Sequence, residues 1–182
     1  MLELNVSEKE FYDPSTNQFI PIPRCTITLE HSLISLAKWE SKWQIPYYDG
    51  LEKTSEQNLD YIRCMVVGPI KDERIFKHLS QTELDTIQDY ILSPMTATTF
   101  SKTKTSQSKR KKEVLTAEVI YAHMFAHSIS MECRKWHLNR LLTLIKACDL
   151  RNTTGDKMSK KDTAQWMAEQ NAARKAKYNT RG

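Results

Sequence analysis

The sequence contains only 4 glycines in 182 residues, which is few for a fold built on tight hairpins or for a glycine-rich loop that cradles phosphate. It has no GxxxxGKT, GxGxxG, HExxH or GxSxG pattern, so the common signatures of nucleotide binding, zinc proteolysis and serine hydrolysis are missing. We therefore predict a helix-rich protein that acts by binding a partner and is not an enzyme.

Long apolar runs are also missing. No stretch reaches the ~18 apolar residues of a membrane-spanning helix. The N-terminus has no basic segment followed by an apolar run, so no secretory signal is expected. The four cysteines are widely spaced and form no CxxC pair. We expect a soluble cytoplasmic protein with reduced cysteines, without a membrane partner and without a cofactor.

Charge is divided unevenly along the chain. Residues 1–100 carry 9 Lys and Arg against 15 Asp and Glu, a net charge of −6, whereas residues 101–182 carry 18 against 7, a net charge of +11. Such a division fits contact with nucleic acid, an acidic protein partner, or self-association through opposite charges. The charge pattern by itself does not choose among the three.

The first 30 residues have the pattern of short strands. Leu2, Leu4 and Val6 alternate with polar residues, and the β-branched segment 25–30 alternates again after turn-forming residues at 13–17. A hairpin alone is marginally stable. We therefore predict a small antiparallel hairpin or sheet over residues 1–30 that packs on helices.

Helical periodicity follows over residues 31–151. A face containing Leu36, Trp39 and Trp43 predicts a helix from Ser32, with at least one tryptophan in the core. Four further helical runs are expected, at 54–66 with Gly68-Pro69 as its stop, 80–92, 114–129 and 130–147, with a break at 153–156. The predicted fold class is α+β, a helix-dominated single domain in which residues 152–182 form a basic helical C-terminal arm.

Residues 101–112 contain no apolar side chain, so burial cannot repay the entropy of ordering them. The sequence predicts a mobile basic loop there. A solvated linker is its simpler interpretation. The alternative is contact with phosphate or an acidic partner through Lys109, Arg110, Lys111 and Lys112.

The pairs His123–His127 and Cys133–His137 each have the i,i+4 spacing that places two side chains on one helical face, and together they offer four zinc ligands. The CxxC turn that usually fixes two thiolates is missing. Cys133 with a neighbouring histidine is also a weak candidate for a thiolate nucleophile, because no strained turn precedes it. We favour core helices with incidental histidines and predict no metal site, with zinc left open.

The C-terminal arm is mostly polar, yet it contains Trp166 and Met167. Aromatic and arginine side chains are enriched at interface hot spots. We therefore predict that Trp166, Met167, Arg174 and Lys175 contribute to partner binding.

Several runs of the sequence, taken together, resemble a family of small proteins encoded in the structural-gene module of long-tailed (siphovirus-like) bacteriophages. They lie in the same order along nearly the whole chain, at residues 29–33, 38–43, 94–100, 135–145, 157–161 and 171–177. The resemblance implies a role in tail assembly, as a chaperone of the tape-measure protein or as a minor tail or neck component. It implies no functional residues, and the loop at 101–112 has the character of a variable insert.

A tape-measure protein exposes apolar helical stripes before the tail tube encloses it. A small protein with a hydrophobic groove rimmed by charge could cover such a stripe. The expected function is therefore that of a non-enzymatic chaperone or adaptor for the tape-measure or tail tube protein, in the host cytoplasm. One alternative is a structural virion component at the neck or tail. The other is a non-specific nucleic-acid-binding protein. The sequence has no helix-turn-helix or other nucleic-acid-recognition motif, which disfavours this alternative.

Overall fold

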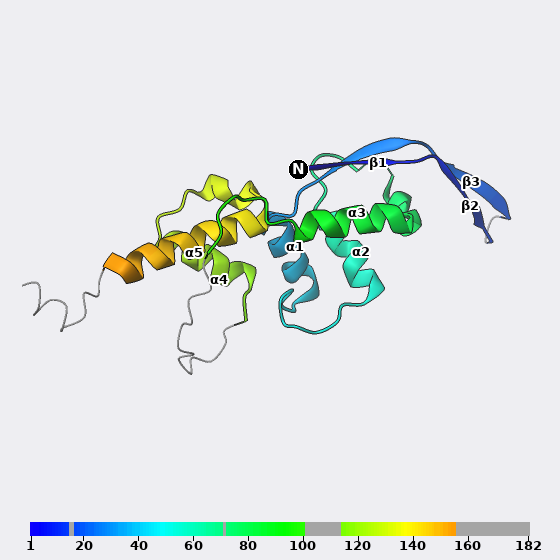
Figure 1. The fold of residues 1–182 in the computed structure, drawn as a ribbon. Helices are drawn as coiled ribbons and strands as arrows, with labels where there is room; N and C mark the ends of the chain where they lie inside the picture. Colours follow the sequence, from blue (N-terminus) through cyan, green and yellow to red (C-terminus); the bar gives the residue numbers. More distant parts are fainter. Residues whose placement is uncertain (15–16, 71, 101–113, 156–182) are drawn as a thin grey trace, which may run out of the picture. The chain divides into compact units, whose positions relative to one another are not determined.

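The computed structural model describes residues 1–14, 17–70, 72–100 and 114–155, and the chain divides into one unit from Met1 to Ile145 and a second from Lys146 to Gly182 (Figure 1). Within the described residues the strands come first and the helices follow. The fold is α+β and helix-dominated, as predicted. No helix of the described ranges is long and apolar enough to cross a membrane. The division into parts 1–30, 31–151 and 152–182 stays a prediction.

The four strands form an antiparallel ribbon in a single register. β1 (Leu2–Val6) pairs with β4 (Cys25–Leu29), and β2 (Lys9–Asp13) pairs with β3 (Gln18–Ile22). Leu2 faces Leu29 and Lys9 faces Ile22, so the pairing resumes unshifted after the interruption at residues 7–8 and 23–24. Pro23 lies in this interruption and has no amide hydrogen to donate to a ladder. The ribbon bends at this point, as Figure 1 shows.

Alternation decides which face of the ribbon is buried. Leu4, Val6 and Leu29 lie on the face that joins the core, whereas Glu3 and Asn5 point to solvent. In the β2–β3 part, Tyr12 and Phe19 pair across the strands on an exposed face, with ring centroids 5.3 Å apart. The β1–β4 part therefore anchors the ribbon to the core.

Helix α1 (Leu33–Trp43) begins at Ser32, whose side chain accepts a hydrogen bond from the Ser35 amide. Trp39 is fully buried, and its Nε1 donates to the Gln57 carbonyl at 2.9 Å. Trp43 is half-buried, and its Nε1 donates to Asp60 at 2.9 Å. The prediction that at least one of these tryptophans belongs to the core is confirmed.

Helix α2 (Ser55–Cys64) begins at the predicted cap, Thr54, but it ends earlier than predicted. The predicted helix over 54–66 was therefore too long at its C-terminal end. Val66 instead forms an antiparallel bridge with Leu29, where the Glu30 amide donates to the Met65 carbonyl at 2.8 Å. The backbone groups released at the helix end are satisfied by the ribbon, so pairing with β4 replaces another helical turn.

A 3₁₀ turn, η1 (Glu73–His78), leads to α3 (Gln81–Leu92), which begins at the predicted Ser80. Strand β1 packs against α3, and the two lie side by side in Figure 1. The N-terminus of α3 is also where the ribbon is anchored, through the contacts described below for Glu83.

The last described elements are α4 (Ala117–Ala126), the 3₁₀ turn η2 (Met131–Lys135) and α5 (Leu138–Gly155). The predicted single helix over 130–147 was wrong. Ser32 and His137 form an antiparallel bridge, and the Leu138 amide donates to the His31 carbonyl at 2.7 Å, so the chain is extended where a helix was expected. The predicted break at 153–156 was also wrong in its first part, because α5 runs to Gly155.

A core of apolar side chains joins the ribbon to the helices of the first unit. Many of its fully buried members come from β4, α1, α4 and the start of α5, among them Leu29, Leu33, Leu36, Ile120, Met124, Leu138 and Leu141, and β3 adds Ile22. Helices α2 and α3 supply the buried residues Tyr61 and Ile87 to this core, and other residues of these two helices line a groove.

Candidate partner-binding groove between helices α2 and α3

A groove lies between α2 and α3 in the first unit. Its larger part has a volume of about 430 Å³ and its smaller part about 310 Å³, and Asn58, Ile62 and Leu84 line both parts. The two parts therefore adjoin each other, and we call them together the helix groove. Its lining residues are Tyr47, Ser55, Asn58, Leu59, Tyr61, Ile62, Phe76, Lys77, Leu79, Gln81, Leu84, Ile87, Gln88, Ile91 and Leu92.

The helix groove has an apolar floor and a neutral polar rim. Buried Tyr61, Ile62 and Ile87 form the floor, whereas the amides of Asn58, Gln81 and Gln88 are exposed. Leu92 also lines the groove and is 68% exposed, so a large apolar side chain is available to a partner. Among the lining residues, Lys77 alone is charged, and the polar side chains are mainly amides.

Both walls of the groove are fixed at their helix N-termini. Thr54 and Gln57 form a reciprocal capping box at the start of α2, and Ser80 and Glu83 form another at the start of α3. Each box satisfies two backbone amides that the helix itself leaves unpaired. Local sequence therefore determines where each groove wall begins.

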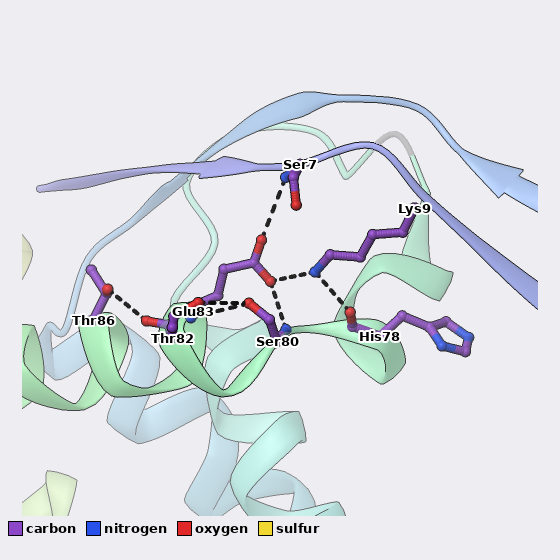
Figure 2. A network of polar contacts seen from close by, with 7 residues as sticks. All are labelled: Ser7, Lys9, His78, Ser80, Thr82, Glu83 and Thr86. Carbon is purple, nitrogen blue, oxygen red and sulfur yellow. Dashed lines mark hydrogen bonds and ion pairs between the residues drawn. The ribbon is translucent and has the colours of Figure 1, made fainter.

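Glu83 additionally joins α3 to the N-terminal ribbon (Figure 2). Its carboxylate accepts hydrogen bonds from the Ser80 amide at 2.6 Å, from Lys9 Nζ at 2.5 Å and from the Ser7 amide at 3.4 Å. Lys9 also donates to the His78 carbonyl at 2.9 Å. Burial disfavours ionisation of Glu83, but the hydrogen bonds from Lys9 and Ser80 outweigh it and hold the pKa of Glu83 below its ordinary value.

Behind the groove floor lies a buried polar network. The Tyr61 hydroxyl and His31 Nδ1 are hydrogen-bonded at 2.6 Å, and the His31 ring meets the His137 ring edge to face at 5.1 Å. His137 Nε2 is bonded to the Tyr90 carbonyl at 3.0 Å. The Tyr90 hydroxyl donates to Glu30 at 2.7 Å. Tyr61 and Tyr90 thus tie α2 and α3 to the same buried cluster.

The two histidines of this network are held neutral. Burial lowers the pKa of His31 to about 3, helped by neighbouring His137. Burial also lowers the pKa of His137, against the opposing effects of the Tyr90 carbonyl and Glu30. His31 Nε2 is buried and has no hydrogen-bond partner in the described structure. A proton on His31 Nε2 would therefore be buried without a hydrogen-bond acceptor among the described residues.

The predicted binding residues Trp166, Met167, Arg174 and Lys175 lie outside the described residues, as do Lys109, Arg110, Lys111 and Lys112. Their roles stay predictions. The four candidate zinc ligands are not brought together as one group. His123 and His127 have stacked rings 6.5 Å apart on α4 and at its C-terminal end, whereas Cys133 is buried in η2. In the described part of the chain, Cys133 and His137 belong to no group of three possible ligands within 4.8 Å.

The helix groove itself was not found from the sequence. Its apolar residues have the same helical spacing as core residues, so the pattern does not separate a stripe facing a neighbour from one facing a groove. The available signal was the uncharged amides of Gln81 and Gln88, which lie three residues before Leu84 and Ile91 and so on the same side of the helix. No protein-family model matches the chain, and neither does any curated protein or solved structure.

Proposed function

We propose that this protein is a non-enzymatic assembly chaperone or adaptor of a long-tailed bacteriophage, and that the helix groove binds apolar helical segments of the tape-measure or tail tube protein. The single observation that supports this proposal is the helix groove between α2 and α3, with its apolar floor and its exposed Leu92. The resemblance to phage structural-module proteins supplies the identity of the partner. The protein would act in the host cytoplasm.

The form of the groove suits an amphipathic helix. Two helices flank an apolar floor, as in helix-in-groove recognition, where anchors at i, i+3, i+4 and i+7 enter the depression. The rim amides both donate and accept hydrogen bonds. They therefore tolerate different polar residues beside the apolar stripe. A chaperone that covers many stripes of one long protein needs this low selectivity.

The first experiment compares two leucine variants with the wild-type chain. Leu92 lines the groove and Leu51 does not, and both side chains are about 70% exposed, so both Leu92→Glu and Leu51→Glu should fold. Tagged protein is purified from nuclease-treated cells that make the phage structural proteins. Mass spectrometry then identifies the proteins that co-purify.

The wild type and Leu51→Glu should recover the tape-measure or tube protein, whereas Leu92→Glu should recover at least about tenfold less, because a buried leucine contributes about 1.5–3 kcal/mol. Equal recovery by both variants would exclude the helix groove as the binding site. Finished virions are analysed in parallel. Absence of the chain from virions supports a chaperone, and its presence supports the alternative of a structural component at the neck or tail.

A further inference from the structure

A second groove lies on the first unit and shares no lining residue with the helix groove. It has a volume of about 380 Å³ and lies between α1 and the segment that follows α2. We call it the edge groove. It is lined by Met1, Glu30, Ser32, Ile34, Ser35, Lys38, Cys64, Met65, Val66, Val67, Gly68 and Lys135.

The edge groove has a backbone acceptor along one side. Val66 faces Leu29 in an antiparallel bridge, and the bonds on either side of this pair are Glu30 N–H to Met65 C=O and Val67 N–H to Thr28 C=O, at 2.8 and 2.9 Å. This is the pattern of a non-hydrogen-bonded pair, in which the carbonyl of Val66 points away from β4. Within the described residues no backbone amide donates to that carbonyl. Residues 65–67 therefore form a short, open sheet edge.

Apolar side chains accompany this edge. Val67 is 49% exposed and Met1 is 73% exposed, while Ile34 and Val66 are half-buried. Gly68, at φ +102°, ends the extended segment, and no atom lies within 4 Å of where its Cβ would be. The edge is thus short, apolar and open beyond its last residue, so it can hold only a few residues of an extended chain.

The charges around the edge groove are mainly positive. Lys38 is exposed and forms no ion pair with the described residues. Among the residues that the structure describes, Lys135 forms an ion pair with the exposed Glu132, at 2.8 Å. Glu30, the one carboxylate in the lining, is already occupied by the Tyr90 hydroxyl and the Met1 ammonium group. A ligand that enters this groove therefore meets one positive charge, that of Lys38, without an ion-pair partner among the described residues.

We propose that the edge groove binds a short extended segment of a partner protein in which small apolar and acidic residues alternate. The segment adds as a strand beside residues 65–67, donates a backbone amide to Val66 C=O, places an apolar side chain over Ile34 and Val67, and places a carboxylate at Lys38. This strand-addition site is distinct from the helix groove in position and in the charge and conformation of its ligand.

The probe is the fluorescein-labelled peptide Glu-Val-Glu-Val-Glu with capped ends, and binding to the full chain is measured by fluorescence polarisation. Its lysine counterpart, Lys-Val-Lys-Val-Lys, should bind at least tenfold more weakly. The same acidic peptide with its central amide N-methylated cannot donate to Val66 and should also lose most of its affinity. Equal binding of the acidic and lysine peptides, or undiminished binding of the methylated one, would overturn the proposal.

The substitution Lys38→Glu should weaken binding of the acidic peptide about three- to tenfold, because an attractive exposed pair becomes a repulsive one. Arg24→Glu, an exposed charge reversal outside the groove lining, is the matched control and should leave the affinity unchanged. Leu92→Glu should also leave it unchanged, which separates this site from the helix groove. If an oligothymidylate displaced the acidic peptide as well as unlabelled acidic peptide does, the site would be one for phosphate and the proposal would fail.

Discussion

Glu83 shows how one side chain can serve two structural purposes. Its Oε2 accepts hydrogen bonds from the Ser80 amide, which completes the capping box, and from Lys9 Nζ. Its Oε1 accepts a hydrogen bond from the Ser7 amide. Its side chain is only 9% exposed and that of Lys9 is 20% exposed, so solvent screens this pair weakly. Glu83 therefore adds a polar anchor between the ribbon and α3 to the apolar packing of β1.

Replacing Glu83 with Gln keeps the shape of the side chain but removes the charge opposite Lys9. We expect the free energy of unfolding to fall by about 1.5–3 kcal/mol, the typical contribution of a hydrogen bond to a charged group. Urea denaturation at pH 7 measures it. Glu132→Gln removes the carboxylate of an exposed pair with Lys135 and should cause no measurable change. A similar small effect for both variants would contradict the anchoring role of Glu83.

The buried His31 predicts a loss of stability in acid. Its pKa is about 3 in the folded protein and about 6.5 in the unfolded chain, so the unfolded state binds more protons between these values. Stability is then complete above pH 6.5 and falls as the pH decreases below it, by about 2 kcal/mol at pH 5. The lowered pKa of His137 acts in the same direction.

Urea denaturation at pH 7.5 and pH 5 measures this loss. His31→Asn, which offers Tyr61 a hydrogen-bonding group that does not titrate, should be less stable at pH 7.5 but should lose less on acidification. If the variant lost as much unfolding free energy between pH 7.5 and pH 5 as the wild type does, His31 would be ruled out as the titrating group.

At the scale of elements, the two groove walls depend on their caps. The Ser80 hydroxyl accepts a hydrogen bond from the Glu83 amide at the start of α3. Ser93 follows the last residue of the same helix, and its side chain forms no hydrogen bond in the described structure. Ser80→Ala should lower the free energy of unfolding by about 1 kcal/mol, whereas Ser93→Ala should have little effect. Thermal unfolding followed by circular dichroism tests both. Equal effects would mean that the cap does not fix the start of α3.

At the scale of the whole molecule, we predict that the helix groove and residues 157–182 make separable contributions to partner binding. Every lining residue of the groove precedes residue 93. A chain truncated after Asp156 should therefore bind a peptide copy of an apolar tape-measure helix with unchanged affinity in fluorescence polarisation. It should recover less intact tail protein if the arm contributes, and Trp166→Ala should reproduce part of that loss. Normal recovery by both variants would exclude the arm as a binding element.

The sequence by itself determined the local features of this protein. Period-two alternation placed strands in the first 30 residues, and Ser32, Thr54 and Ser80 marked the starts of α1, α2 and α3, because capping and side-chain alternation depend on neighbours a few residues away. The α+β class followed from these elements.

Only the tertiary structure decided features that join distant residues. The bridges Leu29–Val66 and Ser32–His137 replaced predicted helix with extended backbone, since pairing with a distant segment satisfied groups that another helical turn would otherwise satisfy. The helix groove also depends on residues that are far apart in the sequence. Whether Leu84 and Ile91 face a neighbouring helix or an open depression depends on how α2 and α3 are spaced, and no short-range pattern carries that spacing.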